Sequence, residues 1–472
     1  MNVIAKRLVS FVTSCLLIGC AAQRYRPAPI VPSATASQFE SRSLADSGLR
    51  SFEERNLGHT ISPWPPKEWD LQTLSLAALY FNPSLDLVRA RLTTAKGAVL
   101  TAGARPNPTF DFTPGIPSPY LLTQDFLFAI ETAGKRRLRV QIASNLNDAA
   151  RFDLADSAWT VLMGVRLTLL NHLVVSQNLD LLRSEQKSRE DQVAILEQVL
   201  SAGEITRFGV DLARIELSKT TVAIRAAEGQ VADAKAALAT AIGIPMAALD
   251  GIEFSWPDMD KLPSPASLSA DQVQRDAVLN RLDIRRSLAQ YAAAESALHL
   301  EIAKQYPNFN IGPGYTYEER NSFFTVGFST SLPVFNRNQG PIAEAEGRRR
   351  QAAAAFLQTQ AQAIEKSERA LAVYKATLKE VAEAQSLYQL QEAQVRRVQE
   401  NIRAGADYRL SLDGAQIQAS ILARAQLDAL ARAQRALGDL EDAVQRPLAP
   451  GEVFPVNAES PGIDKLLPRA KQ

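Results

Sequence analysis

Two long stretches of the chain repeat apolar side chains at alternating spacings of three and four residues, the spacing of a coiled-coil seam. The first seam follows Leu179, Leu182, Gln186, Arg189, Val193, Leu196 and Leu200. Adding 202 to each number gives the second seam, Val381, Ala384, Tyr388, Gln391, Val395, Val398 and Ile402. These patterns predict long helices over about 135–201 and 341–403. A helix of roughly 67 residues extends about 100 Å at 1.5 Å per residue.

Two shorter stretches alternate apolar and polar residues with a period of two, which is typical of half-buried strands. Near 108–131, Phe110 and Phe112 flank Asp111, and a Pro-rich turn at 114–119 follows. Near 308–333 one parity is polar and the other is apolar, the apolar residues being Phe324, Val326, Phe328 and Leu332. Each half of the chain is therefore expected to hold a strand hairpin ahead of its long helix.

Helix breakers recur at the same offset as the seams, so the chain is expected to be an internal duplication. The repeated pairs, 201 or 202 residues apart, are Pro106-Asn107 with Pro307-Asn308, Ala202-Gly203 with Ala404-Gly405, Asp211 with Asp413, and Pro245 with Pro447. Asn82 and Pro83 predict the start of a short helix that ends near 104. A return helix leaves each glycine break and ends near 242 or 445, so each break is the tip of a helical hairpin.

These patterns divide the chain into six segments. The expected boundaries are 1–19 for a signal peptide, 20–69 for a lipidated extended tether, 70–245 for the first repeat, 246–270 for a connector, 271–447 for the second repeat and 448–472 for a C-terminal tail. The tether is predicted because residues 24–68 are rich in Pro, Ser and Ala and lack sustained periodicity.

The N-terminus has the pattern of a bacterial lipoprotein signal. Lys6 and Arg7 precede an apolar run to Leu17 that is too short to span a membrane. The run closes with Leu-Ile-Gly-Cys, which resembles the lipoprotein box and makes Cys20 the expected site of lipid attachment. Ala21 is not the Asp that retains such proteins at the inner membrane, so the outer membrane is favoured. The alternative is a plain secretory signal with a chance cysteine.

Charge and composition exclude several functional classes. The 52 basic and 51 acidic residues nearly cancel, so nothing predicts a nucleic-acid partner. The three histidines do not cluster in the sequence, so neither a metal site nor another cofactor is expected. The sequence lacks a nucleophile elbow, a metal box and a phosphate loop, so no catalytic residue is expected and the chain is not predicted to be an enzyme.

The four expected strands cannot form a closed structure in a membrane by themselves. A bacterial membrane barrel needs about eight strands or more, because an open sheet edge in lipid leaves backbone groups without partners. The protein must therefore associate. Two copies would supply about eight strands and three would supply about twelve, and both numbers remain open on this count.

The chain resembles the outer membrane factor (TolC) family, nearest its CzcC-like cation-efflux branch. The resemblance covers about 70–447 and rests on the duplication, the Asn-Pro helix start, the Gly134-Lys135-Arg136 run and the Ala-Gly tips followed by Asp. It implies a mainly α fold with a small β part. In this fold three copies share a twelve-stranded outer-membrane β-barrel continued by a coiled-coil helical tunnel.

The resemblance also implies a function and a set of partners. The implied function is the outer-membrane channel of a tripartite RND-type efflux system, a passive exit duct across the periplasm and the outer membrane. The implied partners are two further copies in a homotrimer, a periplasmic adaptor protein, an inner-membrane RND transporter and outer-membrane lipid. Heavy-metal cations and drugs both remain open as substrates. The alternatives are the outer-membrane component of another export system, such as type I secretion, and a structural coiled-coil lipoprotein of the envelope.

The two tips, near 202–208 and 404–410, are where the resemblance implies docking of the adaptor. The candidate residues are Gly203, Glu204, Thr206, Arg207, Gly405, Ala406, Asp407 and Tyr408. The tips differ in polar sequence, which favours docking over a turn alone. The family closes its periplasmic mouth with acidic rings and polar links, which makes Arg409, Asp413 and Asp211 gate candidates. A solvated Asp near the first helical turn is the alternative.

A basic cluster, Lys135, Arg136, Arg137 and Arg139, stands at the predicted start of the first long helix. Positive charge there opposes the helix dipole, so another interaction must favour it. Anionic lipid head groups are one candidate, worth about 1 kcal/mol per residue. The alternative is a solvated basic face.

Overall fold

The computed structural model describes residues 25–115, 121–265 and 268–448. The chain divides into two compact units, Met1–Arg42 and Ser43–Gln472. In the described part of the first unit, α2 (Pro32–Glu40) has Pro at its first position and buries no side chain. The predicted signal peptide, Cys20 and the C-terminal tail beyond Leu448 lie outside the described residues.

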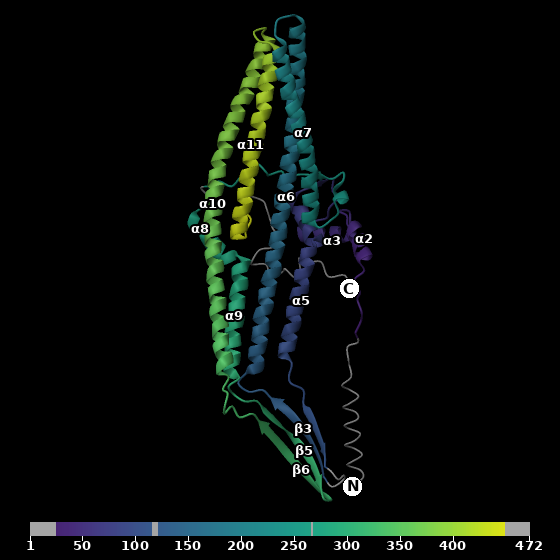
Figure 1. Cartoon of the computed structure of the whole chain (residues 1–472), viewed down its shortest axis with the longest axis vertical. Helices are drawn as coiled ribbons and strands as arrows, with labels where there is room; N and C mark the ends of the chain where they lie inside the picture. Colours follow the sequence, from purple (N-terminus) through teal and green to yellow (C-terminus); the bar gives the residue numbers. More distant parts are fainter. Residues whose placement is uncertain (1–24, 116–120, 266–267, 449–472) are drawn as a thin grey trace. The chain divides into compact units, whose positions relative to one another are not determined.

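The second unit contains two copies of one succession of elements (Figure 1). The first copy comprises α4 (Leu71–Phe81), α5 (Pro83–Gly103), β2 (Thr109–Pro114), β3 (Leu121–Ile130), α6 (Lys135–Ser201) and α7 (Arg207–Ile242). The second copy comprises α8 (Ala270–Asn280), α9 (Leu282–Ala303), β5 (Phe309–Glu318), β6 (Asn321–Thr330), α10 (Gln339–Arg403) and α11 (Arg409–Val444). The predicted strand hairpins, long helices and return helices are confirmed. The short helices α4 and α8 were not predicted.

The long helix α6 lies at the centre of the second unit. It packs against α5 and α9 over its first half and against α7 and α11 over its second half (Figure 1). In the described part of the chain, α6 is the one helix long and apolar enough by composition to cross a membrane, but half of its most apolar stretch is buried inside the fold. Its apolar character is therefore explained by the helices that surround it.

Each short helix before the strands meets the return helix of its own copy end to end. In the first copy, the Asn82 amide donates a hydrogen bond of 2.8 Å to the Ala241 carbonyl. In the second copy, the Arg281 guanidinium donates one of 3.0 Å to the carbonyl of Ala443, the equivalent of Ala241. Since α5 has 21 residues and α7 has 36, the two together nearly match the 67 residues of α6 beside them.

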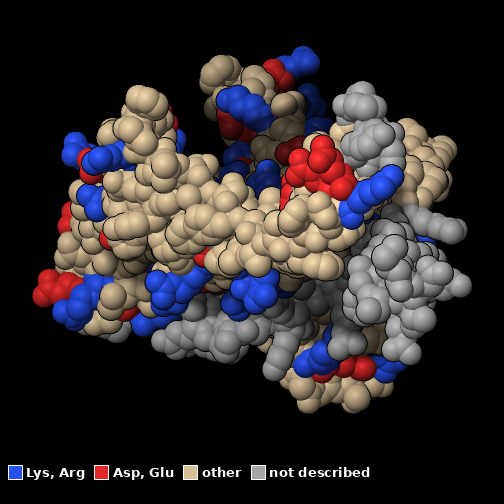
Figure 2. All heavy atoms as spheres, turned by 90° about the horizontal axis from the view of Figure 1, so that it is seen from below, with Lys and Arg blue, Asp and Glu red and all other residues tan. Residues whose placement is uncertain are grey.

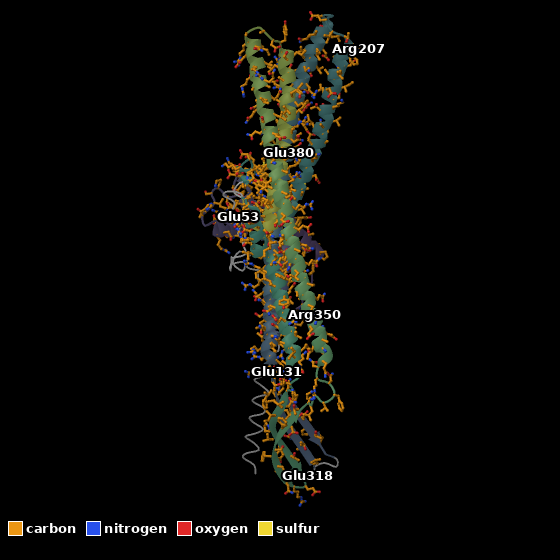
Figure 3. The ribbon with its side chains drawn as sticks, turned by 90° about the vertical axis from the view of Figure 1, so that its left-hand side faces the viewer. Glu53, Glu131, Arg207, Glu318, Arg350 and Glu380 are labelled. Atoms are coloured by element: carbon orange, nitrogen blue, oxygen red, sulfur yellow. The ribbon has the colours of Figure 1, made fainter. Side chains whose placement is uncertain are left out.

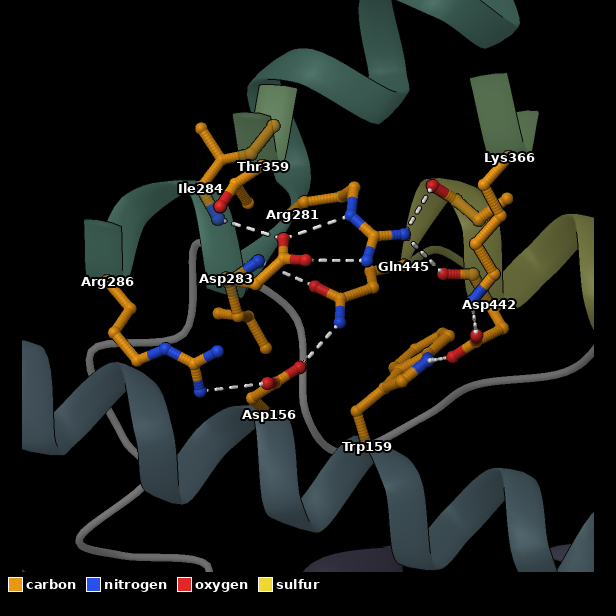
Figure 4. Close-up of polar contacts among 12 residues, drawn as sticks. Asp156, Trp159, Arg281, Asp283, Ile284, Arg286, Thr359, Lys366, Asp442 and Gln445 are labelled. Carbon is orange, nitrogen blue, oxygen red and sulfur yellow. Dashed lines mark hydrogen bonds and ion pairs between the residues drawn. The ribbon is translucent and has the colours of Figure 1, made fainter. Parts of the chain in front are cut away.

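A polar network at this joint holds the two copies together (Figure 4). Gln445, which ends α11, donates a hydrogen bond of 2.8 Å to Asp156 of α6. Asp442 accepts one of 2.9 Å from the Trp159 indole and forms an ion pair with Lys366 of α10. The network thus ties α6 of the first copy to α10 and α11 of the second.

The prediction of an extended tether is wrong for the residues that belong to the second unit. The segment α3 (Ser47–Leu57) is a helix, and the Asp46 carboxylate caps its first turn. Its side chains pack in the main apolar core with α4, α6 and α7. Between residues 43 and 69, the fully buried apolar residues are Leu44, Leu49, Phe52 and Trp69. These few apolar residues dock the segment despite the Pro and Ser around them.

The connector between the copies is also ordered against the helices. It holds the short 3-10 helix η1 (Met246–Leu249) and the strand β4 (Glu253–Phe254), which pairs in parallel with β1 (Glu68–Trp69). The Tyr374 hydroxyl of α10 donates a hydrogen bond of 2.7 Å to the Pro263 carbonyl. The connector therefore contacts both copies at the level of the joint.

Gly243 provides a test of the end-to-end joint. Its φ is +89°, and a Cβ there would lie 2.8 Å from Asn82 Cα. We expect Gly243→Ala to lower the free energy of unfolding by about 2–4 kcal/mol, through left-handed strain and overpacking. Gly203→Ala, at φ +78° with open space around it, should cost about 1–2 kcal/mol. Thermal unfolding in detergent measures both, and equal losses would contradict the close approach.

Glu53 of α3, labelled in Figure 3, provides a test of how this helix docks. It is fully buried, neither carboxylate oxygen has a hydrogen-bond partner among the described residues, and burial together with the charge of Asp70 raises its pKa to about 8. Because the pKa is raised from 4.5, the protonated form stabilises docking fully at low pH, and this stabilisation is lost as the pH rises towards about 8.

We therefore expect amide hydrogen exchange in α3 to accelerate between about pH 4.5 and 8, beyond the intrinsic effect of pH. Glu53→Gln should remove this extra dependence, whereas Glu68→Gln, at an exposed position, should leave it in place. An unchanged pH dependence in Glu53→Gln would rule out this carboxyl as its source.

Candidate functional site

The four long strands form one antiparallel sheet at the end of the second unit opposite the helix tips (Figure 1). Their order is β2-β3-β5-β6, so the hairpins of the two copies join through β3 and β5. Ile130 lies opposite Phe309 at this central pairing. Among the described strands, β2 and β6 each have a neighbour on one side only. Both outer edges therefore present unpaired backbone groups.

The register gives the sheet two chemically different faces, because side chains alternate along each strand. One face is apolar, and its residues between 40% and 87% exposed are Phe110, Phe112, Phe126, Phe128, Ile130, Ile311, Phe324, Val326 and Phe328. The other face is mainly polar or small and carries Asp111, Thr113, Thr123, Asp125, Asn310, Gly312, Gly314, Thr316, Thr325, Gly327 and Ser329. From this end, broad areas without charged residues lie between mixed charged patches (Figure 2).

Two carboxylates stand opposite each other on the polar face. Asp111 of β2 is the cross-strand neighbour of Asp125 of β3. On the other side of Asp125, a Cβ at Gly314 would lie 2.2 Å from Asp125 Oδ1 and 2.4 Å from Thr325 Oγ1. Because Gly314 has no side chain, the Asp125 carboxylate can occupy the space beside it. The polar face is acidic at this point.

The predicted basic cluster lies where the sheet joins the helices, and two of its members cap other helices. The Lys135 amine, on a side chain that is mostly buried, donates to the Tyr306 carbonyl and, at 2.6 Å, to Asn308 Oδ1. Arg136 Nε donates to the Gly103 carbonyl at 2.7 Å. These carbonyls stand at or just beyond the C-terminal ends of α9 and α5, where positive charge is favourable. The positive charges of Lys135 and Arg136 oppose the dipole of α6. They are favourable for α9 and α5, which run antiparallel to α6 and end beside them.

The other two members of the cluster differ from each other. Arg139 forms an ion pair with Glu131, which directly follows β3. Arg137 is exposed and forms no hydrogen bond or ion pair with any residue that the structure describes. A contact with lipid head groups is thus not needed to explain Lys135, Arg136 or Arg139, and it remains a prediction that fits Arg137 best.

Both tips are the Schellman turns that their glycines predict. Gly203 and Gly405 have φ values of +78° and +74°. The N–H groups of Glu204 and Ala406 donate back to carbonyls five residues earlier, at 3.2 and 2.8 Å. The other docking candidates are exposed except for half-buried Asp407, and Figure 3 labels Arg207 at this end. Adaptor docking here remains a prediction.

Of the three gate candidates, the structure brings two together. Arg409 forms an ion pair of 3.2 Å with Asp191 of α6, and both line a groove of about 610 Å³ between α6, α10 and α11. Asp413 lines the same groove, is only 2% exposed, and its Oδ2 has no hydrogen-bond partner among the described residues. Burial, reinforced by Asp191, raises the pKa of Asp413. Asp211 lies apart on α7, half-exposed and 3.9 Å from Arg214.

The sequence analysis did not predict a charged cluster around Glu185. Glu185 of α6 forms a partly buried ion pair of 2.7 Å with Arg424 of α11, and it also pairs with Arg189 at 2.8 Å. The polar interruption of the seam at Arg189 was the only signal of this cluster. The charged contacts Glu185–Arg424 and Asp191–Arg409 both join α6 of the first helical hairpin to α11 of the second.

No group of three or more His, Cys, Asp or Glu side chains placed to hold a metal ion occurs among the described residues. His172 packs edge-on against Phe254, with ring centroids 5.1 Å apart. Burial lowers its pKa, which favours the neutral ring.

Several solved outer-membrane proteins have the same arrangement of a sheet carried on two hairpins of long helices. The similar solved structures include VceC of Vibrio cholerae, with a TM-score of 0.63 and 20% identity over 79% of this chain and 95% of that chain. CmeC of Campylobacter jejuni gives 0.64 and 15% over 92% and 95%. The open state of MtrE of Neisseria gonorrhoeae gives 0.63 and 18% over 80% and 89%. The mainly α fold with a small β part that the resemblance implies is thus confirmed for the single chain, whereas the shared barrel of three copies stays a prediction.

No family model matches the chain. A curated relative is the cobalt-zinc-cadmium resistance protein CzcC of Cupriavidus metallidurans, which is 23% identical over 273 residues. That match covers 57% of this chain, and the chain spans 64% of the length of CzcC.

The basic cluster gives a matched pair of substitutions. Lys135→Ala should lower the free energy of unfolding by about 1–3 kcal/mol, because the Tyr306 carbonyl beyond α9 and the Asn308 amide oxygen lose a partly buried donor. Arg137→Ala, two positions on, should change it by about 0.5 kcal/mol or less. Thermal unfolding of both variants in detergent compares them. Equal effects would mean that the capping contacts of Lys135 contribute nothing.

Proposed function

We propose that this chain is the outer-membrane channel subunit of a tripartite RND-type efflux system, a passive exit duct for substrates across the periplasm and the outer membrane. The sheet carries the proposal. Its exposed apolar face suits hydrocarbon, and its polar face suits a water-filled lumen. Its two unpaired edges would be costly in hydrocarbon, so the sheet must continue into further copies.

Unpartnered helix surface also supports an assembly. The seam of α6 is buried at Leu179, Leu182 and Val193, whereas only Val398 of the seven equivalent seam positions of α10 is buried. A long helix with so little buried surface in one chain needs a partner. Three copies, the number that the family resemblance implies, would supply about twelve strands, enough for a closed barrel.

The remaining parts of the proposal concern location, partners and cargo. We place the protein in the outer membrane, anchored by lipid at Cys20, with its helices in the periplasm. Its tips would meet a periplasmic adaptor protein that links it to an inner-membrane RND transporter. The name of CzcC concerns cobalt, zinc and cadmium resistance, and the facing carboxylates Asp111 and Asp125 suit cations, so heavy-metal cations are the first cargo to test.

Conductance across a planar lipid bilayer tests the channel directly. Purified, folded oligomers should insert and give discrete, uniform current steps, whereas heat-denatured protein from the same preparation should give none. A structural envelope lipoprotein would form no pores. Folded oligomers that insert without conducting, in Asp413→Ala as well as in the native chain, would contradict the proposal.

Asp413 is expected to act on the closed state of such a channel. Replacing it with Ala removes a buried carboxylate between the two hairpins, and a shift of about 1 kcal/mol in the gate equilibrium would raise the open probability about fivefold. Asp211→Ala is the matched control, because that carboxylate is half-exposed and close to Arg214. An unaltered open probability in Asp413→Ala would remove this residue from the gate.

A further inference from the structure

A charged pair is buried at mid-length, where the two copies of the repeat meet. The Arg166 guanidinium of α6 forms an ion pair of 3.4 Å with Glu441 of α11, and both side chains are at most 3% exposed. Arg166 also donates a hydrogen bond of 3.0 Å to Gln434 Oε1. The ring of Trp256, in the connector, lies 4.6 Å from the guanidinium carbon. Arg166 therefore joins α6, α11 and the connector in one buried contact.

Two further features of the second copy fit this buried pair. A Cβ at Gly438 of α11 would lie 3.3 Å from Arg166 Nε, so the glycine leaves room for the guanidinium. The Leu448 N–H, just beyond α11, donates a hydrogen bond of 2.7 Å to Glu441 Oε1. Both charges thus have additional polar partners, which a buried ion pair needs to offset its lost hydration.

Other polar contacts of α6 with the second copy surround the buried pair (Figure 4). Asp156 accepts a hydrogen bond of 2.8 Å from Gln445 and forms an ion pair of 3.2 Å with Arg286 of α9. The Trp159 indole donates a hydrogen bond of 2.9 Å to Asp442 of α11. Each of these contacts joins the first copy to the second.

The equivalent positions, 202 residues away in the other copy, carry different chemistry. On α10, the equivalents of Asp156, Trp159 and Arg166 are Gln358, Ala361 and Glu368. On α7 and at its C-terminal end, the equivalents of Gln434, Gly438, Glu441, Asp442 and Gln445 are Ala232, Ala236, Ala239, Thr240 and Gly243. A buried ion pair can therefore form between α6 and α11, whereas α10 and α7 have no oppositely charged residues at these positions.

The duplication allows the two copies to dock in two ways within one chain. In the observed closure α6 packs against α11. In the alternative closure α10 would pack against α7, which are the equivalents of the same two helices. The connector over residues 246–270 could extend about 80 Å, so its length permits either closure. Burial of apolar helix surface favours both closures, because it is not directional.

The charged residues distinguish the two closures. In the alternative closure Glu368 would take the place of Arg166, and Ala239 would take the place of Glu441. A carboxylate buried there without a cation would be costly, whereas the observed closure pairs both charges. Polar groups that are satisfied in one arrangement and unsatisfied in another exclude the second arrangement.

We propose that the buried pair of Arg166 and Glu441, with the polar contacts around it, selects the observed closure over the alternative one when the chain folds. Arg166 and Glu441 are then residues that determine which helices of the two copies meet. This selection operates within a single chain, so it does not depend on the proposed function.

Two matched pairs of introduced thiols report the two closures. Asn171 of α6 and Arg435 of α11 are neighbours, with 3.4 Å between Oδ1 and Nη2, so a short bismaleimide should join Asn171→Cys to Arg435→Cys within one chain. Their equivalents on α10 and α7 are Val373 and Asp233. A crosslink between Val373→Cys and Asp233→Cys within one chain marks the alternative closure. It has the mass of one chain, so products that join two chains are counted separately on a denaturing gel.

Removing one partner of the buried pair should shift the balance. Glu441→Leu leaves the Arg166 guanidinium buried without its carboxylate in the observed closure, whereas the alternative closure leaves it in water. We expect the alternative crosslink to rise about fivefold or more. Adding Arg166→Met removes the unpaired charge and should return both crosslinks to their native proportions. Asp428→Leu removes an exposed carboxylate from the same helix and is the matched control, which should change neither crosslink.

A milder variant keeps the test decisive if Glu441→Leu does not fold. Arg286→Gln removes the half-buried ion pairs with Asp153 and Asp156, and it should raise the alternative crosslink in the same direction. Thermal unfolding in detergent shows which variants are folded.

The outcomes separate selection from simple stabilisation. A rise of the alternative crosslink in Glu441→Leu that Arg166→Met reverses, or a rise in Arg286→Gln, supports the selection. Folded variants that lose the observed crosslink without gaining the alternative one would overturn it, because the polar contacts would then only stabilise. Unchanged proportions in both variants would overturn it as well. Conductance of the native oligomers is measured apart from these crosslinks, so the channel stands or falls separately.

Discussion

Unpaired backbone groups along the two edges of the four-stranded sheet constrain the rest of the structure. In water these groups would be solvated. The neighbouring apolar face, on which Phe324 and Val326 are largely exposed, suits hydrocarbon, where each unsatisfied group costs several kcal/mol. The edges β2 and β6 come from different copies of the repeat, one at each side of the sheet. If the β6 edge of each chain pairs with the β2 edge of the next around a closed ring, no edge is left unpaired. Each chain therefore has one edge strand from each repeat, and several chains can close the sheet by pairing these edges.

The helices of the two copies are held together by polar contacts. At mid-length, the network around Asp156, Asp442 and Gln445 fixes the two copies against each other. Towards the tips, the contacts between the copies include the charged pairs Glu185–Arg424 and Asp191–Arg409 and the groove with Asp413. Asp156, Asp442 and Gln445 have hydrogen-bond partners at the joint, whereas Asp413 Oδ2 near the tips has none among the described residues. The contacts that hold the two copies together are therefore more complete at mid-length than near the tips, where the proposed duct would open.

Periodic features could be predicted from the sequence, and features made by contacts between distant segments could not. The seam through Leu179 and Leu182 predicts α6 because one helix repeats its own spacing. The docking of α3 escaped prediction because only a few apolar residues, such as Leu49 and Phe52, carry it. The capping role of Lys135 could not be predicted for another reason, since one of its acceptors, the Tyr306 carbonyl, belongs to the other copy of the repeat. Asp413 was identified as a candidate because Asp211 occupies the equivalent position in the first repeat. Its burial could not be predicted, because it depends on α6, which lies far away in the sequence.

The central claim is that the sheet edges are paired between chains in the membrane. Amide hydrogen exchange of the protein reconstituted in lipid, followed strand by strand, measures this most directly. If the edges pair between chains, β2 and β6 are protected as strongly as β3 and β5, because all four strands then have neighbours on both sides. Fast exchange along β2 and β6 beside protected β3 and β5, in a preparation whose helices are folded, would show an open sheet and contradict pairing between chains.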